Sequence, residues 1–389
     1  MNIVCYKNII FYNGIFYTDK NKIIPAFTHN RLKTNEYIYL PADIETIKLT
    51  ETPTLFEYGI LYIDHFHWNR SHMLWDHIYP SWYGLFCNYT EQSINSNFKW
   101  ITKRDRSDIH VYTHIDIIEK FSGSHVSTLS EFTKENNKPL LIPWLITGLE
   151  DIGISHINKY NLHVKRGLEI NDIDPIETFV NRMYNRYNIK RNTLLNGLSN
   201  NCKNVIYIVN KRKYIGMNDL FNKMNEKYKN RFDFKIIDYT KNNFEHQLNL
   251  LNTTCLCIAG IGSARFSTPF LPNGAIEIQT FNHCILNKNF IEYFDYHGGT
   301  LSKFIKIVNI PYYTQNEAKE NKCSEHLEKY ICEELENIPC KVPVDFDNNI
   351  PTEIKNLKMN KNYDKMFDVW RNNMTTSIEN LMELLQKND

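Results

Sequence analysis

The sequence lacks the paired cysteines and the long apolar runs that mark several common protein classes. Its nine cysteines are odd in number and form no Cys-x-x-Cys pair, which favours reduced thiols over a disulfide framework. No segment stays apolar over the length that a membrane span needs, and residues 1–19 lack a continuous signal-peptide core. We therefore expect a soluble, cytoplasmic chain without a membrane span.

The sequence also lacks a charge excess of either sign. Its 45 basic and 44 acidic residues give a net charge of +1, which argues against a nucleic-acid partner held by a strong positive field. Local basic pockets for a small anion remain compatible with this balance. The 389 residues are 42% hydrophobic, so we expect well-packed cores divided over two or three domains.

The later half alternates short apolar runs with helical patterns. The expected strands are 205–209, 234–238, 255–259, 276–278 and 304–308, and the expected helices are 218–228, 243–251 and 289–294. Alternation at this spacing predicts a parallel, doubly wound α/β sheet.

The turn after residues 255–259 contains the candidate phosphate site. Gly260 and Gly262 allow the backbone to approach a ligand closely, and Ser263 is suited to cap a short helix. Such a turn points N–H groups and the positive end of a helix dipole at one spot. Glu277 is expected at the carboxyl edge of the next strand, where open α/β sheets bind ligands. An ordinary tight strand–helix connection is the alternative.

A basic turn follows the first strand of this half. Lys211 and Arg212 come directly after residues 205–209, and carboxyl strand ends share one edge of a parallel sheet. We expect both side chains to converge with the glycine turn on one diphosphate through charge-assisted hydrogen bonds. A solvated basic turn is the alternative.

The candidate acid–base site lies in the first half. A strand over 58–64 and a polar loop precede Ser71, the expected N-cap of a helix from residue 72 towards 86, interrupted at Pro80. His72 and Asp76, four residues apart, would share a face of that helix. A solvated cap region over an aromatic core is one alternative.

A metal site is another alternative for this stretch. His65, His67, His72, Asp76 and His77 contain enough ligand atoms for zinc, but no second cysteine/histidine cluster accompanies them.

Other elements divide the chain. Residues 130–137 resemble a charged turn, 175–188 a helix and 188–203 a polar linker, while 325–336 and 361–386 are expected helices. The predicted domains are an N-terminal α/β domain over 1–190, a nucleotide-binding domain over 195–320, and a connector with a C-terminal helix over 321–389.

Two segments resemble glycosyltransferase family 61. The first is His72-Met-Leu-Trp-Asp76 with Pro80, similar to the family's His-Trp-Leu-Leu-Asp-x-x-Pro helix. The second comprises Asn218-Asp-Leu220, Gln247, Ala259-Gly-Ile-Gly-Ser-Ala264, Phe270-Leu-Pro-Asn-Gly274 and Ile276-Glu-Ile278.

The resemblance implies an inverting glycosyltransferase of the GT-B architecture, with two Rossmann-like domains facing a cleft. It implies a UDP-sugar donor, a glycan or glycoprotein acceptor and no required cofactor or metal. Asp76 would be the general base, with His72 beside it. The implied donor-binding residues are Lys211, Arg212, Gln247, Gly260, Ile261, Gly262, Ser263, Ala264, Arg265 and Glu277.

The chain departs from the family at the turn, where Gly262-Ser263 replaces His-Gly and Arg265 replaces a later glycine. A non-catalytic nucleotide- or glycan-binding relative is therefore the second hypothesis, and a metal-dependent hydrolase is the third. Two Asp-x-Asp triplets, Asp172-Ile-Asp174 and Asp345-Phe-Asp347, suit the metal-dependent glycosyltransferase plan. Such triplets arise easily by chance, and we interpret both as structural.

Overall fold

The computed structural model divides the chain into two compact units, Met1–Ile189 (unit 1) and Lys190–Asp389 (unit 2). The structure describes residues 4–23, 26–27, 37–38, 41–63, 70–79, 82, 96–102, 114–147, 175–195, 202–209, 216–260, 263–284, 305–312 and 325–338. The helices expected over 289–294 and 361–386 lie outside these residues.

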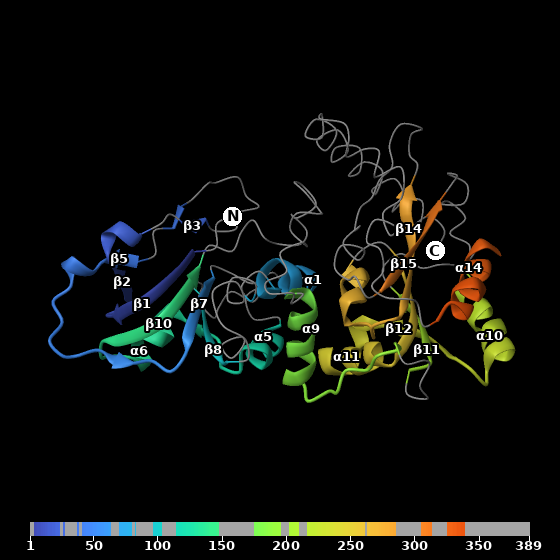
Figure 1. Cartoon of the computed structure of the whole chain (residues 1–389), viewed down its shortest axis with the longest axis horizontal. Coiled ribbons are helices and arrows are strands. Elements are labelled where there is room, and N and C mark those ends of the chain that lie inside the picture. The colour runs from blue at the N-terminus through green and yellow to red at the C-terminus, as the bar shows by residue number, and fades with distance from the viewer. Residues whose placement is uncertain are drawn as a thin grey trace. The chain divides into compact units, whose positions relative to one another are not determined.

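Unit 1 is built on an eight-stranded mixed sheet with the order β5-β2-β1-β10-β7-β8-β9, in which β6 also pairs with β10 (Figure 1). Its strands are β1 (Val4–Tyr12), β2 (Ile15–Thr18), β5 (Pro41–Asp43), β6 (Thr54–Leu55), β7 (Gly59–Ile63), β8 (Phe98–Thr102), β9 (Ser127–Thr128) and β10 (Leu140–Thr147). β3 (Ala26–Phe27) and β4 (Tyr37–Ile38) form a separate antiparallel pair. The first strands thus join the main sheet through the antiparallel β1–β10 pair.

The described helices of unit 1 are mostly short. They are η1 (Lys20–Lys22), η2 (Ile44–Thr46), α1 (Arg70–His72), the π-helical η3 (Met73–Ile78), α5 (Ile115–Ser122), α6 (Leu129–Glu135) and α9 (Pro175–Arg186). The helix expected over 175–188 is confirmed as α9, which starts at a proline as helices often do.

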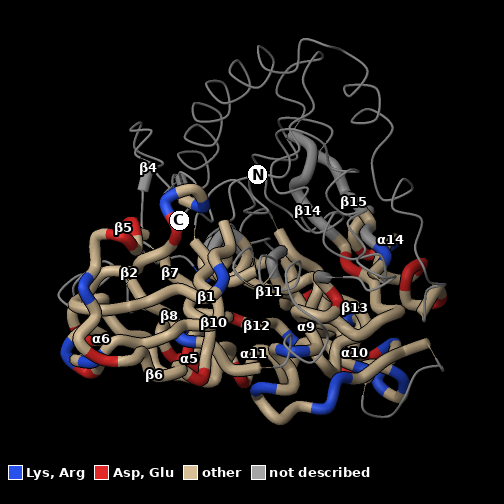
Figure 2. Tube along the Cα trace, turned by 60° about the vertical axis from the view of Figure 1, so that its left-hand side comes forward, with Lys and Arg blue, Asp and Glu red and all other residues tan. Residues whose placement is uncertain are grey.

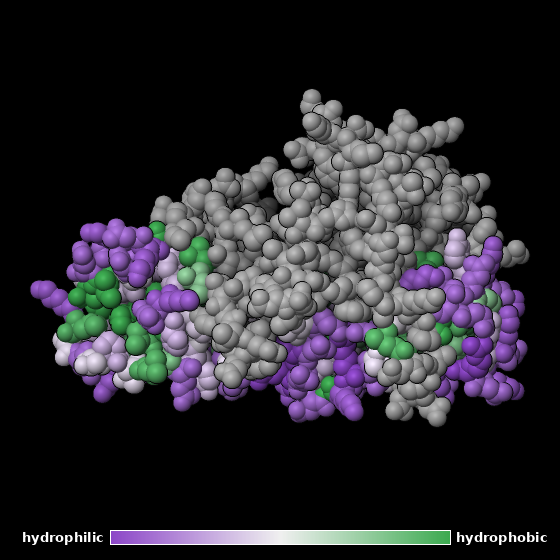
Figure 3. Space-filling model, in the orientation of Figure 1, coloured by the Kyte–Doolittle hydropathy of each residue, from purple (hydrophilic) through white to green (hydrophobic). Residues whose placement is uncertain are grey.

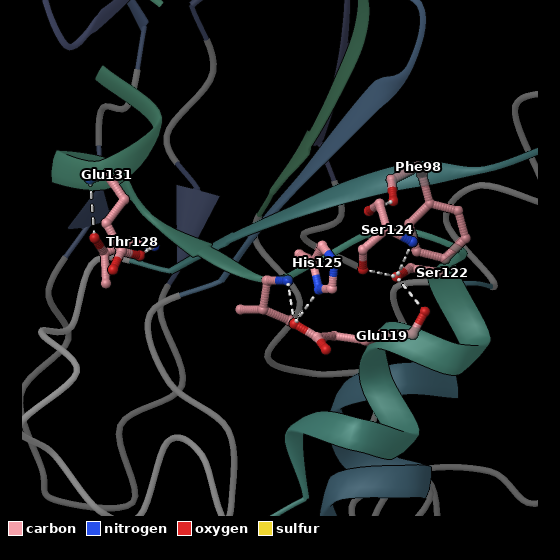
Figure 4. A network of polar contacts seen from close by, with 8 residues as sticks. Phe98, Glu119, Ser122, Ser124, His125, Thr128 and Glu131 are labelled. Carbon is pink, nitrogen blue, oxygen red and sulfur yellow. Dashed lines mark hydrogen bonds and ion pairs between the residues drawn. The ribbon is translucent and has the colours of Figure 1, made fainter. Parts of the chain in front are cut away.

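Residues 130–137 are not the charged turn that we predicted, because most of them form α6. Thr128 caps this helix: its hydroxyl accepts from Glu131 N at 3.0 Å, and Glu131 Oε2 accepts from Thr128 N at 2.9 Å. This reciprocal pair is a capping box, which satisfies two of the N–H groups that open a helix. Figure 4 shows it beside a second polar network, in which Glu119 accepts from Val126 N at 2.9 Å.

Aromatic side chains hold α9 in unit 1. The ring of Phe179 lies 5.0 Å from that of Phe121 and 5.4 Å from that of Trp75, centroid to centroid. Arg182 is only 3% exposed and donates to the carbonyl oxygens of Phe121 and Ser96, both at 3.0 Å. Burial, with Arg186 nearby, lowers the pKa of Arg182 to about 9.

Unit 2 contains a five-stranded sheet with the order β12-β11-β13-β14-β15, parallel throughout. Its strands are β11 (Asn204–Val209), β12 (Asp233–Asp238), β13 (Thr254–Ala259), β14 (Ile276–Cys284) and β15 (Lys306–Tyr312). The helices are α10 (Met217–Tyr228), η4 (Tyr239–Lys241), α11 (Phe244–Asn252), the 3₁₀ helix η5 (Ser263–Phe270) and α14 (Glu325–Glu336). A mixed α/β chain with a parallel sheet in this half is therefore confirmed.

The segment that enters unit 2 is tied to its sheet, although we predicted a linker over 188–203. Asn192 N donates to Asn252 Oδ1 at 2.7 Å, and Asn252 Nδ2 donates to Lys190 O at 2.9 Å. Arg191 reaches Asn273 Oδ1 at 3.0 Å, and Leu194 N donates to Asn273 O at 2.9 Å. Since Asn252 precedes β13 and Asn273 precedes β14, this segment lies along the amino edge of the sheet.

Large exposed apolar side chains are few among the described residues. Ile15, Ile44, Leu49 and Leu55 belong to unit 1, where Figure 3 shows hydrophobic atoms on the surface, and Leu195 belongs to unit 2.

Candidate functional site

The strand order of unit 2 reverses between β11 and β13. The chain passes from β11 to β12 on one side, then returns to the other side of β11 for β13, β14 and β15. Open α/β sheets bind ligands in the crevice that such a reversal creates at the carboxyl ends of the strands. The carboxyl ends of β11 and β13 are therefore the candidate site.

The register places the ends of β11 and β13, which precede the two predicted phosphate segments, side by side at this edge. Ile208 of β11 pairs with Ala259, the last residue of β13. Gly260 follows Ala259 and is buried, while Lys211 and Arg212 begin two residues after β11 ends. The strands that precede the two predicted turns are therefore neighbours, whereas Lys211 and Arg212 themselves lie outside the described residues.

The turn after β13 leads into η5. Ile261 and Gly262 lie outside the described residues. η5 begins at Ser263, so this residue is the first of the short helix rather than the N-cap that we predicted. The helix is of the 3₁₀ type and contains Pro269. Ala264 is buried, and its carbonyl oxygen accepts a hydrogen bond from Ser267 Oγ. Arg265 lies in the same turn of helix, so its backbone is on the edge that we predicted.

Glu277 is not at the carboxyl edge of its strand, which corrects our prediction. It is the second of nine residues in β14, which continues to Cys284. Glu277 is 1% exposed and pairs in register with Cys257 of β13. Burial and the charge of Glu277 raise the pKa of Cys257 well above its usual value. Glu277 thus belongs to the interior of the sheet.

The sequence pattern missed the length of β14 because Ile276-Glu-Ile278 is its most apolar part. Gln279 pairs with Ala259, and beyond it β14 pairs with β15, from Thr280↔Ile310 to Cys284↔Tyr312. The register is irregular between Thr280 and Cys284. Figure 1 shows β14 and β15 extending beyond the other strands of this sheet, so they border the candidate site on the β13 side.

Gln247 has a structural role in the described structure. Its amide nitrogen donates to Tyr239 O at 2.8 Å and to Asn242 O at 3.0 Å, and its side chain is buried. These bonds fix the connection between β12 and α11. A contact of Gln247 with a donor stays a prediction.

The candidate catalytic residues His72 and Asp76 follow β7 in the chain. The order of strands in unit 1 reverses at β7, as it does at β11 in unit 2. In unit 1 the chain runs from β7 to β8 and β9, and then returns to the other side of β7 for the parallel strand β10. His72 ends α1 and Asp76 lies in η3. The helix begins at Arg70, so Ser71 lies inside it and is not the N-cap that we predicted.

The helix changes from the α type at His72 to the π type at Asp76. η3 is a π-helix, in which hydrogen bonds join residues five apart rather than four. Its Met73, Leu74, Trp75 and Ile78 are buried and anchor it to the unit. Short π-helical stretches occur frequently at functional sites. The backbone of Asp76 thus lies on a helix that buried side chains anchor to unit 1. This helix comes after the carboxyl end of β7, and open α/β sheets bind ligands at such a position.

Metal ligands do not gather among the residues that the structure describes: no cluster of three or more His, Cys, Asp or Glu side chains is found there. His65, His67 and both Asp-x-Asp triplets lie outside those residues. None of the described helices is both long and apolar enough to span a bilayer.

Comparison with known proteins gives one family. The model of the family Glycosyltransferase 61 matches residues 132–278. The matched region begins in α6, ends in β14 and includes all ten predicted donor-binding residues, whereas His72 and Asp76 precede it. No curated protein matches the chain.

Proposed function

Because the match over residues 132–278 supports membership of glycosyltransferase family 61, we propose that this chain is an inverting glycosyltransferase. It transfers a sugar from a nucleotide-diphosphate donor, a UDP-sugar, to a hydroxyl group of a glycan or glycoprotein. The observation that carries the proposal is that the matched region includes the glycine turn, which leaves the sheet of unit 2 at its topological switch point.

The donor diphosphate binds at the carboxyl edge between β11 and β13. Backbone N–H groups of Gly260 to Arg265 and the cations of Lys211 and Arg212 hold its oxygens. As the bond to the anomeric carbon breaks, negative charge grows on the leaving diphosphate. Fixed N–H groups and cations stabilise that charge without reorganising, so we propose that the nucleotide diphosphate leaves without the help of a metal ion. The ends of β11 and β13, adjacent in register, support this arrangement.

The acceptor hydroxyl is deprotonated by Asp76. A carboxylate that takes this proton while oxygen attacks the opposite face of the anomeric carbon gives inversion. His72 orients the acceptor or the base. In the proposed GT-B arrangement the sugar nucleotide lies between the two units. The order of strands in unit 1 reverses between β7 and β10, and the helix that contains His72 follows β7 in the chain. This position supports ligand binding at the carboxyl end of β7 as well.

The second candidate is a nucleotide- or glycan-binding relative without activity. It is favoured by one observation, the replacement of the family's His-Gly by Gly262-Ser263 in the phosphate turn. In this case the switch point of unit 2 still binds UDP, but no sugar is transferred.

A panel of nucleotide sugars tests the two candidates. Wild-type protein, Asp76→Asn and the matched control Asp116→Asn, on the exposed side of α5, are assayed for release of nucleotide diphosphate with and without acceptor glycans. We expect turnover by wild type and by the control, and transfer slowed about 100- to 10,000-fold in Asp76→Asn. Equal rates in all three proteins would exclude Asp76 as the base. Calorimetric UDP binding without turnover of any donor would favour the second candidate.

A further inference from the structure

One segment of unit 2, residues 190–194, holds both ends of the stretch that contains the proposed phosphate turn. This stretch runs from the start of β13 through the turn and η5 to the start of β14. At its beginning, Asn192 N donates to Asn252 Oδ1 at 2.7 Å and Asn192 Nδ2 donates to Asn252 O at 2.8 Å. At its end, Leu194 N donates to Asn273 O at 2.9 Å. The two ends of the stretch are therefore fixed to the same short piece of chain.

Arg191 of this segment also reaches the end of η5 itself. Its Nη2 atom lies 3.4 Å from the carbonyl oxygen of Pro269, 3.3 Å from that of Leu271 and 3.0 Å from Asn273 Oδ1. The last carbonyl groups of a helix have no donor within the helix, and a cation beside them is favourable. Basic residues of the described chain, Arg191 among them, are blue in Figure 2. Arg191 therefore caps the C-terminal end of the helix that follows the phosphate turn.

The orientation of η5 depends on contacts with other elements, because its own hydrogen bonds are weak. It is a 3₁₀ helix, in which hydrogen-bond geometry is poorer than in an α-helix, and Pro269 has no N–H group to donate. Thr268 and Phe270 are buried, and the ring of Phe270 lies 6.1 Å from that of Phe244 of α11, edge to face. The guanidinium group of Arg191 adds polar contacts to this apolar packing, so it helps to set the direction of the helix.

We propose that Arg191 is a positioning residue for the donor diphosphate. It acts through η5 and does not touch the ligand. By holding the C-terminal end of this helix, it sets the direction in which the N–H groups at the N-terminal end point. Hydrogen bonds weaken steeply as their angle departs from linear, so a small rotation of η5 would weaken the contacts with phosphate. This inference rests on the proposed function, in which the glycine turn binds the diphosphate.

Substitution of Arg191 in the full chain tests this role. Arg191→Met removes the donors and keeps much of the side-chain volume, whereas Arg191→Lys keeps a cation that can donate to the same carbonyl groups. Asn225→Ala is the matched control, because it removes hydrogen bonds with the N and O atoms of Phe234 elsewhere in unit 2. The dissociation constants of UDP and of uridine are measured by NMR titration, and Tm is measured by thermal denaturation.

The positioning role predicts a loss of affinity that depends on phosphate. We expect Arg191→Met to raise the dissociation constant of UDP about 2- to 10-fold, the factor that corresponds to one net hydrogen bond. The affinity for uridine, which has no phosphate, should stay unchanged, and Arg191→Lys should retain most of the affinity for UDP. Asn225→Ala should lower Tm and leave both dissociation constants unchanged.

The outcomes separate this inference from the proposed function. Failure of the wild-type protein to bind UDP would overturn both. Equal affinity of wild type and Arg191→Met for UDP would overturn only the positioning role. Equal weakening of UDP and uridine would overturn it as well, because a general loss of structure does not discriminate between the two ligands.

Amide hydrogen exchange of the wild-type protein gives a second measurement, which does not require the variant to fold. We expect UDP to slow exchange both in η5 and in residues 190–194, because the two are joined by the contacts of Arg191. Slower exchange in η5 with no change in residues 190–194 would contradict the coupling on which the positioning role depends.

Discussion

Ile208 and Ala259 are paired across β11 and β13, so these two strands end side by side at the carboxyl edge of the parallel sheet. The basic segment at Lys211 and Arg212 and the turn at Gly260 are separated by almost fifty residues of sequence, yet the strands that precede them are neighbours in the sheet. This relationship gives the proposed diphosphate site two independent contributions, one of side-chain charge and one of backbone N–H groups.

Removing the side-chain charge should weaken nucleotide binding. For the double variant Lys211→Gln/Arg212→Gln we expect the dissociation constant of UDP, measured by calorimetry, to rise at least about 100-fold, because two charge-assisted hydrogen bonds contribute about 1.5–3 kcal/mol each and 1.4 kcal/mol corresponds to a factor of ten. Lys229→Gln, an exposed position just after α10, is the matched control. An unchanged affinity in the double variant would show that the phosphate does not contact this turn.

Adding one methyl group at Gly59 should destabilise unit 1. A Cβ at this position would lie 1.7 Å from Cε2 of Trp144, a ring on the neighbouring strand β10. Overpacking of this kind costs about 1–3 kcal/mol, so the denaturant midpoint of Gly59→Ala should fall. Adding Trp144→Leu makes room, so the double variant should lose less than the sum of the single variants. Strict additivity of the two would contradict the clash.

Removing the N-cap of α6 should lower the free energy of unfolding by less than the substitution at Gly59. Thr128→Ala loses the acceptor for Glu131 N, which costs about 1 kcal/mol of unfolding free energy. Thr128→Ser keeps the hydroxyl and should stay close to wild type in chemical denaturation. Equal losses in both variants would mean that the methyl group, rather than the hydrogen bond shown in Figure 4, stabilises this site.

The buried thiol of Cys202 should make unfolding depend on alkaline pH. Burial raises its pKa from 9.0 to about 12, so between these values the unfolded chain releases a proton that the folded chain keeps. The stabilising contribution is therefore complete below pH 9 and is lost as pH rises towards 12. We expect the urea midpoint to fall less steeply above pH 9 in Cys202→Ala than in wild type. Parallel slopes would refute this origin.

Strands β11, β12 and β13 of unit 2 could be predicted well from sequence because each is a compact apolar run with a described helix after it. The helix α14 also begins at Glu325 and ends at Glu336, as expected. The strands β11 and β13, which precede the basic segment and the glycine turn, were found at their expected positions. These elements are encoded within a few residues of sequence, which is where pattern reasoning is reliable.

The errors arose where long-range pairing determines the structure. β14 continues to Cys284 because β15 pairs with it, and this displaces Glu277 from the edge to the interior. β1 pairs with β10 along almost its whole length, which no local pattern could indicate. The capping box of α6 had a readable signal in Thr128 and Glu131, but our sequence analysis interpreted the charged residues 130–137 as a turn and did not use it.

The hydrogen bonds of Arg191 and Asn192 have a consequence for how a substrate would reach unit 2. They hold the first residues of unit 2 at the amino edge of its sheet, beside the starts of β13 and β14. These hydrogen bonds thus lie at the opposite end of the strands from the carboxyl ends of β11 and β13, where we propose that the donor diphosphate binds. A donor bound at the proposed site would therefore leave the contacts of Arg191 and Asn192 with the sheet intact.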